Sequence, residues 1–143
     1  MKMRRVFCVI VVAAAALGAQ GVTNVFEMPF AYPRHRHLQQ QLVQVVRAGQ
    51  IEEMERICRD GVALLPQDPT WQYNLACALA YRADKREALE ALERAVDLGF
   101  RDDAAIASDN DLKQLKGEKK FADLIGKAKR LKGQPVEGVV QAH

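Results

Sequence analysis

Residues 68–100 limit the possible folds of this chain more than any other stretch, because they read as two helices joined by one tight turn. Asp68 and Pro69 predict a helix start, in which the Asp side chain caps the helix and Pro occupies its first turn. Apolar residues then recur at helical spacing on both sides of a turn at 83–84. Gly99 ends the second helix, since glycine tolerates the left-handed conformation that often closes a helix. The stretch therefore predicts two packed amphipathic helices.

The same pattern occurs once more upstream, with a period of 34 residues. Five small, apolar or turn-forming residues match the residues 34 positions later: Val45, Gly49, Met54, Cys58 and Gly61 precede Leu79, Ala83, Ala88, Leu92 and Ala95. Gly49 falls at the turn between the helices, and Gly61 falls at a position where close packing is expected. The register therefore predicts one unit over residues 35–68 and a second unit over 69–102.

This register resembles the tetratricopeptide repeat (TPR), a family of helix-turn-helix units with a 34-residue period. The resemblance implies an all-α fold, a TPR-like antiparallel helix-hairpin solenoid of two repeats plus capping helices. The first unit departs from the family pattern at Leu42 and Met54, which replace the small residues expected where the two helices cross, and at Gln41, which replaces Leu. We therefore expect a wider crossing in the first unit.

After Phe100 the period becomes weaker, and three short helical segments are predicted at about 102–107, 110–116 and 118–131. An apolar stripe runs through them, formed by Leu112, Leu115, Phe121, Leu124, Ile125 and Leu131. The last repeat of a stack leaves one apolar face uncovered, and a terminal helix with a polar outer side must cover it. Residues 103–132 are therefore predicted to cap a helical domain that spans 34–132.

The ends of the chain are predicted to lie outside this domain. Residues 1–21 combine a basic start, a short apolar run and small residues, as in a secretory signal peptide, and they predict export to the periplasm or the medium. An uncleaved membrane anchor is the alternative. Residues 22–33 contain two prolines and no helical period, so we expect an extended linker whose aromatic residues pack on the helices or bind a partner. Residues 133–143 are predicted to be a flexible tail.

Charge gives no reason to expect a nucleic-acid partner. The formal net charge of +3 arises from residues 1–21, and the remaining chain has 18 basic and 18 acidic residues. The distribution is uneven, because residues 52–103 carry twelve acids and seven bases whereas residues 111–132 carry three acids and eight bases. This asymmetry suggests electrostatic docking, or simply solvated helix faces.

The sequence contains no motif of a catalytic, metal or phosphate site, so neither an enzyme nor a cofactor is predicted. His35 and His37 are two residues apart, which directs them to different faces of a helix and argues against a metal site. Cys58 and Cys77 fall on helices that pack together in a TPR stack. A disulfide between them and two buried thiols are both compatible with the sequence.

The resemblance implies a non-enzymatic protein-protein interaction module that binds a partner segment on a concave surface. By the register, that surface is lined by Arg36, Gln40, Arg47, Tyr73, Asn74 and Tyr81, with Gln39, Val43 and Cys77 beside them. Asn74 occupies a position from which many TPR proteins bind a ligand backbone. Gln39 and Val43 stand where the carboxylate-clamping TPR type has a basic residue and Asn, so a peptide C-terminus is not the expected ligand.

Several alternatives remain at this point. Tyr73 and Tyr81 could fill space between helices instead of contacting a partner. A membrane-tethered assembly factor would require the N-terminal segment to stay uncleaved, and only then is a membrane contact expected. An accessory domain of a cell-envelope enzyme is the third possibility, although no pair of carboxylates marks a catalytic loop.

Overall fold

The computed structural model describes residues 31–136, in which helices are joined by short turns and loops and no strand is present. This confirms the all-α fold class for the described residues. The elements are α1 (Ala31–Arg47), α2 (Ile51–Leu64), α3 (Pro69–Tyr81), α4 (Lys85–Asp97), α5 (Asp103–Ser108), the 3₁₀-helix η1 (Lys113–Leu115) and α6 (Lys119–Leu131). The predicted signal peptide and most of the predicted linker and tail lie outside the described residues.

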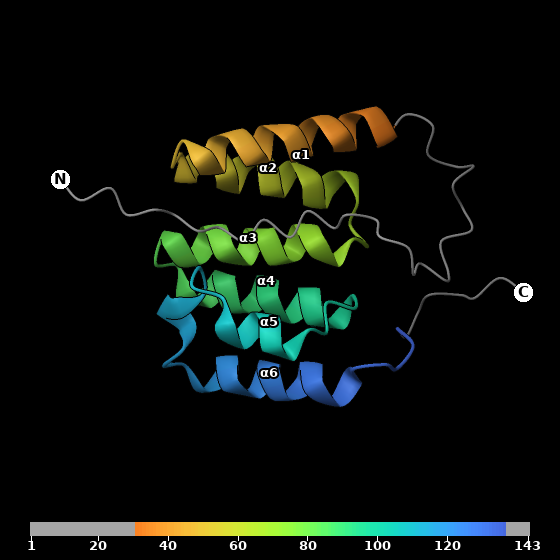
Figure 1. The fold of residues 1–143 in the computed structure, drawn as a ribbon, viewed down its shortest axis with the longest axis vertical. Helices are drawn as coiled ribbons and strands as arrows, with labels where there is room; N and C mark the ends of the chain where they lie inside the picture. Colours follow the sequence, from red (N-terminus) through yellow and green to blue (C-terminus); the bar gives the residue numbers. More distant parts are fainter. Residues whose placement is uncertain (1–30, 137–143) are drawn as a thin grey trace, which may run out of the picture.

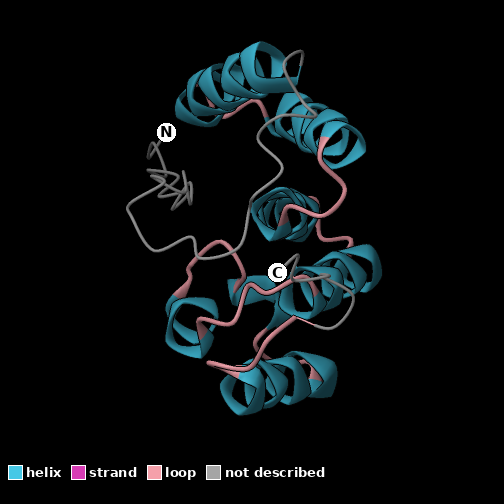
Figure 2. Ribbon diagram, turned by 90° about the vertical axis from the view of Figure 1, so that its right-hand side faces the viewer, coloured by secondary structure: helices cyan, strands magenta, loops and turns pink. Residues whose placement is uncertain are grey.

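The helices lie side by side in layers, and α3 is in the middle of the stack (Figures 1 and 2). α1 packs on α2, α2 on α3, and α3 on α4. Beyond α4, the helix α6 packs on both α4 and α5, and η1 reaches back to α3 and α4. Most contacts therefore join elements that are close in sequence, and η1 is the element that returns to the centre.

The helix starts follow the 34-residue spacing further along the chain than the sequence pattern indicated. α2, α4 and α6 begin at residues 51, 85 and 119, and α3 and α5 begin at residues 69 and 103. The expectation that the period fades after Phe100 is therefore incomplete, because the helix starts keep their spacing there. What changes is the length of α5, which ends at Ser108 after six residues.

The turns explain why the helices start where they do. Gly49 and Ala83, 34 residues apart, both adopt positive φ, at 68° and 61°. Glycine adopts this conformation without steric cost, whereas alanine does so only with strain. Asp84 then caps α4 by accepting a hydrogen bond from the backbone N–H of Glu87. The predicted turn at 83–84 is confirmed.

The start of α3 also follows the sequence prediction. The side chain of Asp68 accepts a hydrogen bond from the backbone N–H of Thr70 at 2.8 Å, and Pro69 occupies the first turn. The linker predicted over residues 22–33 overlaps the first helix, so its predicted end at residue 33 is wrong. α1 begins at Ala31 and contains Pro33, which is tolerated because the first turn of a helix needs no backbone donor there.

α3 is the centre of the hydrophobic core, and every residue from Trp71 to Ala80 is buried. The indole of Trp71 lies directly over Gly61 of α2, where an added Cβ atom would be 2.2 Å from the ring. Close packing at Gly61, as the register predicted, is confirmed. The half-buried His35 of α1 contacts the same indole edge-on, with ring centroids 5.7 Å apart.

The segment predicted as a cap packs on α4. Its buried side chains belong to the same core as those of α3 and α4, and they are Ile106, Leu112, Leu115, Phe121, Leu124 and Ala128. Salt bridges join the two surfaces: Lys120 pairs with Glu93 at 2.7 Å, and Lys127 pairs with Asp97 at 2.5 Å. The uneven charge distribution seen in the sequence thus serves, at least in part, contacts within the chain.

Candidate functional site

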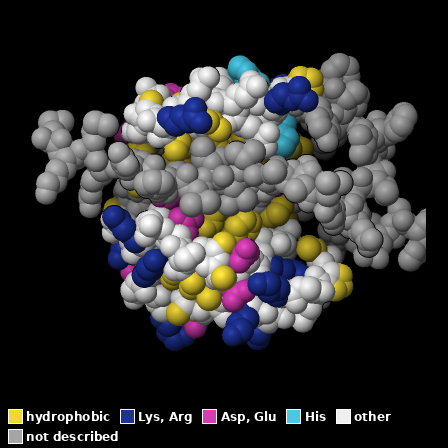
Figure 3. All heavy atoms as spheres, in the orientation of Figure 1, with side chains coloured by type: hydrophobic (Ala, Val, Ile, Leu, Met, Phe, Trp, Pro, Cys, Tyr) yellow, Lys and Arg dark blue, Asp and Glu magenta, His cyan; other side chains and the backbone are white. Residues whose placement is uncertain are grey.

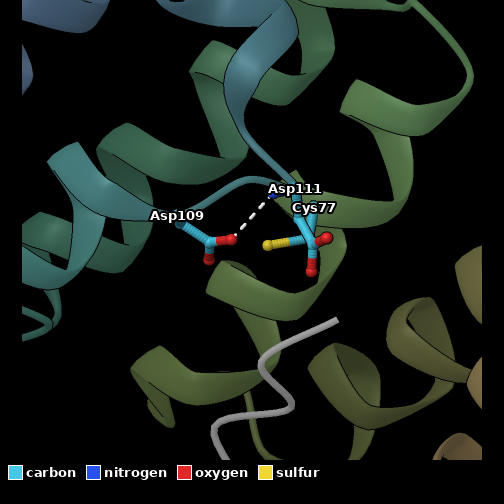
Figure 4. A group of neighbouring side chains, drawn as sticks. All are labelled: Cys77, Asp109 and Asp111. Carbon is cyan, nitrogen blue, oxygen red and sulfur yellow. Dashed lines mark hydrogen bonds between the residues drawn. The ribbon is translucent and has the colours of Figure 1, made fainter. Parts of the chain in front are cut away.

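Three residues of α3, four positions apart, form one line along the helix and face a loop that follows α5. We call Tyr73, Cys77 and Tyr81 the inner stripe, and residues 109–111 the acidic loop. Both Asp109 and Asp111 are buried. Figure 4 shows their carboxylates close to Cys77, whose sulfur points toward Asp109. The arrangement brings a thiol, two carboxylates and two phenols together in the interior.

Hydrogen bonds fix the acidic loop on the inner stripe. The hydroxyl of Tyr73 donates to Oδ2 of Asp109 at 2.6 Å, and the hydroxyl of Tyr81 donates to Oδ1 of Asp111. The backbone N–H of Asp111 donates to Oδ1 of Asp109 at 2.8 Å, which closes a tight turn within the loop. Buried carboxylates need such donors, because an unpaired buried charge is strongly destabilising.

Tyr73 is also held by stacking. Its ring lies on that of Phe100, with centroids 4.0 Å apart and planes 16° from parallel. Burial raises the pKa of the Tyr73 hydroxyl well above its ordinary value, and electrostatic interaction with Cys77 and the hydrogen bond to Asp109 raise it further. Tyr73 therefore remains protonated at any physiological pH and acts as a constant hydrogen-bond donor to Asp109.

The same cluster contains the donor atoms of a possible metal site. The ligand atoms of Cys77, Asp109 and Asp111 lie within 4.8 Å of one another. A thiolate with two carboxylates suits a borderline divalent cation such as Zn²⁺. However, three of the four carboxylate oxygens already accept hydrogen bonds from tyrosine or the backbone. The geometry thus supports a hydrogen-bonded latch between the acidic loop and α3 more directly than a coordination site.

The concave-surface residues expected from the register are divided between two environments. Tyr73 and Asn74 are buried, Tyr81 is half-buried, and both tyrosines bond to the acidic loop. In contrast, three residues of α1 are exposed: Arg36, Gln40 and Arg47. The two tyrosines therefore contact the acidic loop, while the α1 residues are accessible.

The contribution of Asp109 and Asp111 was missed at the sequence level. The sequence pattern places Ser108 and Asp109 only at a break between the helical segments predicted at 102–107 and 110–116. The register carried a usable signal, because Asp111 lies 34 positions after Cys77 and Asp109 lies 34 positions after Leu75. Two acids at positions where the preceding unit has apolar residues mark the place where the regular pattern ends.

Cys58 and Cys77 are both thiols, with no disulfide between them in the structure. Cys58 is fully buried in α2, and burial raises the pKa of its thiol to about 12. It is therefore an unreactive side chain at neutral pH. Cys77 belongs to the inner stripe, where a small side chain leaves room for the acidic loop.

A second candidate, an open hollow at the turn between α3 and α4, is lined by charged residues. Glu55 of α2 pairs with Arg59 at 2.8 Å and also with Arg82, and Arg59 pairs with Glu87 at 2.9 Å. Partial burial acts to raise the pKa of Glu55, but hydrogen bonds from Arg82 and Arg59 outweigh it and lower the pKa. The network thus ties α2 to α4, and its contribution to stability is lost as the pH falls through that lowered pKa.

Replacing Asp109 should reveal how much the latch contributes. Asp109→Ala removes the acceptor of the Tyr73 hydroxyl and of the Asp111 N–H, so we expect a loss of about 1–3 kcal/mol in the free energy of unfolding, measured by urea denaturation. Asp123→Ala is the control, since Asp123 is exposed and pairs with Lys119 on the surface of α6. That variant should stay within about 0.5 kcal/mol of the unmodified chain.

Equal stabilities of the two variants would show that the latch is dispensable. A metal role for the cluster would give a different result. Zn²⁺ would then raise the melting temperature of the unmodified chain, and Cys77→Ser would abolish that increase.

Comparison of the chain with protein-family models, with curated proteins and with solved structures found no match. Among residues 31–136, no helix has the length and apolar character needed to cross a membrane. The site must therefore be interpreted from its own geometry.

Proposed function

We propose that residues 31–136 form a TPR-like stack of helix hairpins that acts, outside the cytoplasm, as a non-enzymatic module for binding a partner protein. The spacing of the helix starts supports this proposal, because it repeats the 34-residue period of that family. α2, α4 and α6 begin at residues 51, 85 and 119, and α3 and α5 begin at residues 69 and 103. In such a stack the first helices of successive units line one surface. Here those helices are α1 and α3.

The observation that carries the proposal is a line of exposed polar residues on α1. Arg36, Gln40 and Arg47 fall within about 40° of one another around the helix axis at 100° per residue, and all three are exposed. Half-buried Val43 lies on the same line. We call these four residues the α1 stripe. Figure 3 shows Lys and Arg side chains over α1, at the top of the face in view.

The chemistry of the α1 stripe favours an acidic partner segment. Two guanidinium groups provide charge-assisted hydrogen bonds to carboxylates or phosphates, and Gln40 can donate to and accept from an extended backbone. The equivalent positions of α3 are Thr70, Asn74, Cys77 and Tyr81, of which the last two lie against the acidic loop. Partner contacts are therefore expected mainly on α1, with α3 forming the floor.

Charge reversal on α1 tests this function. Binding of a panel of acidic, neutral and basic peptides would be measured by fluorescence anisotropy at low and at physiological salt. We expect acidic peptides to bind best. In the Arg36→Glu, Arg47→Glu variant their affinity should fall at least about tenfold, because each charge-assisted hydrogen bond contributes about 1.5–3 kcal/mol.

The matched control is Arg34→Glu, a charge reversal on the same helix that is exposed but lies about 160° from Arg36 around the helix axis. It should leave both peptide affinity and melting temperature unchanged. Equal loss in the control, or no preference for acidic peptides in the unmodified chain, would contradict a binding role for the α1 stripe.

A further inference from the structure

α1 is the outermost helix at one end of the stack (Figure 1). It packs on α2, and its buried side chains are Leu42 and Val46. At 100° per residue, the α1 stripe is centred about 110° from these two side chains around the helix axis. A segment that binds the α1 stripe therefore lies beside α1, along a helix of 17 residues, and not between α1 and α2.

The α1 stripe has the residue spacing of a helix-packing face. Its four members are separated by four, three and four residues, which is the alternation by which two helices pack side by side. At 1.5 Å per residue, Arg36 and Arg47 are about 16.5 Å apart along the axis. A second helix alongside α1 can place one side chain opposite each member, because its own residues rise by the same amount.

An extended segment does not match this spacing. Its side chains on one side recur about every 6.7 Å, so successive ones fall at about 13 Å and about 20 Å and neither is level with Arg47. An extended backbone also leaves N–H and C=O groups for the surface to satisfy, and Gln40 is the one amide among the four residues. A helix satisfies its backbone groups internally, so it needs no such donors and acceptors.

We infer that the partner segment of the α1 stripe is an amphipathic helix with two acidic residues 11 positions apart, one opposite Arg36 and one opposite Arg47. Eleven residues correspond to about three full turns, so both acids lie on one side of that helix. An apolar side chain between them packs on the half-buried Val43. This description of the partner rests on the proposed function, because it concerns the same surface.

The same spacing argues against a second copy of this chain as the partner. No two Asp or Glu residues in the sequence are 11 positions apart. No helix of a second copy can therefore present one acid to Arg36 and another to Arg47 in this way. The acidic helix is expected from a different protein.

Three fluorescently labelled peptides test the inference. The first has Glu at positions 3 and 14 and Leu at positions 7 and 10 of a helix-forming host of Ala and Gln, which places all four on one side. The second has the same composition, but its later Glu is at position 12 and lies on the opposite side of the helix. The third is the first peptide with Pro at position 9, which prevents a continuous helix. Binding would be measured by anisotropy at low salt, and helix content by circular dichroism.

We expect the first peptide to bind at least about tenfold more tightly than the second, because only the first can pair with both arginines. Its helix content should rise on binding. In the Arg47→Gln variant, the affinity of the first peptide should fall to that of the second. The matched control, Arg34→Gln, removes an exposed positive charge about 160° from Arg36 around the axis of α1 and should preserve the difference between the peptides.

Equal affinities of the first two peptides would overturn the inference, and so would binding of the proline peptide as tightly as the first. In either case a preference for acidic over basic peptides would leave the proposed function intact. No such preference would contradict the proposed function and the inference together. Self-association of the unmodified chain that Arg47→Gln abolishes, measured by analytical ultracentrifugation, would indicate a second copy as the occupant and would also overturn the inference.

Discussion

A chain that ends at Asp102 should fail to fold cooperatively. Removing residues 103–143 deletes α5, η1 and α6, which place six buried side chains against α3 and α4. Five of these side chains are large, and the sixth belongs to Ala128. Burial of a large apolar side chain contributes about 1.5–3 kcal/mol, so the five account for about 7–15 kcal/mol. This equals the whole stability of a typical domain, about 5–15 kcal/mol. Thermal unfolding followed by circular dichroism should therefore show a broad transition, and size-exclusion chromatography should show association.

The apolar face of α4 explains this result. Leu92 and Val96 are fully buried and Leu89 is nearly so, and α6 and η1 both pack on this helix. Without them, the face would be exposed to water. The control is a chain that ends at Val136, which retains every helix of the described structure and should melt as the full chain does. A truncated chain 1–102 that is monomeric and unfolds cooperatively would disprove the capping role of residues 103–132.

Gly61→Ala should destabilise the protein, although alanine is the better helix former. An added Cβ atom would lie 2.2 Å and 2.3 Å from two carbon atoms of the Trp71 indole, which is itself only 2% exposed. The ring is enclosed by the core and cannot move freely. Overpacking of this kind costs about 1–3 kcal/mol or more and outweighs the gain of about 1 kcal/mol in helix propensity. Urea denaturation would measure the difference.

Two comparisons separate the clash from other effects. Gly126→Ala changes a glycine of α6 whose added Cβ would only touch the end of Arg130 at 3.4 Å, so that variant should gain about 0.5–1 kcal/mol. In a Trp71→Leu background the clash is absent, and Gly61→Ala should then be neutral or stabilising. Equal effects of Gly61→Ala in both backgrounds would show that the indole does not restrict this position.

The positions of the helices could be predicted from local sequence signals. Asp68 and Pro69 mark the start of α3, Gly49 and the 83–84 turn separate helices, and Gly61 marks a close contact. Each of these signals acts within a few residues of its own position, or reports a small side chain at a crossing. A single sequence is enough to detect these signals, because each depends on the type of residue at one position.

The contact between the acidic loop and the inner stripe could not be predicted in the same way. Tyr73 and Asp109 are 36 residues apart and Tyr81 and Asp111 are 30 apart, and each pair meets only after α4 and α5 have been packed. A tyrosine on a first helix is equally compatible with a partner surface and with a bond to a later loop. The outcome depends on where α5 ends, which is Ser108. The local sequence pattern therefore predicts a surface position for Tyr73 and Tyr81 but does not predict their contacts with Asp109 and Asp111.

The layered packing of the chain also has a consequence for the order in which the molecule forms. Neighbouring helices contact each other along the chain, so α1 to α4 can associate through short loops, and low contact order favours rapid folding. The hydrogen bonds from Tyr73 to Asp109 and from Tyr81 to Asp111 instead join residues that are 36 and 30 positions apart in the sequence. They should form on the native side of the main barrier. Asp109→Ala is thus expected to accelerate unfolding and to leave the refolding rate almost unchanged.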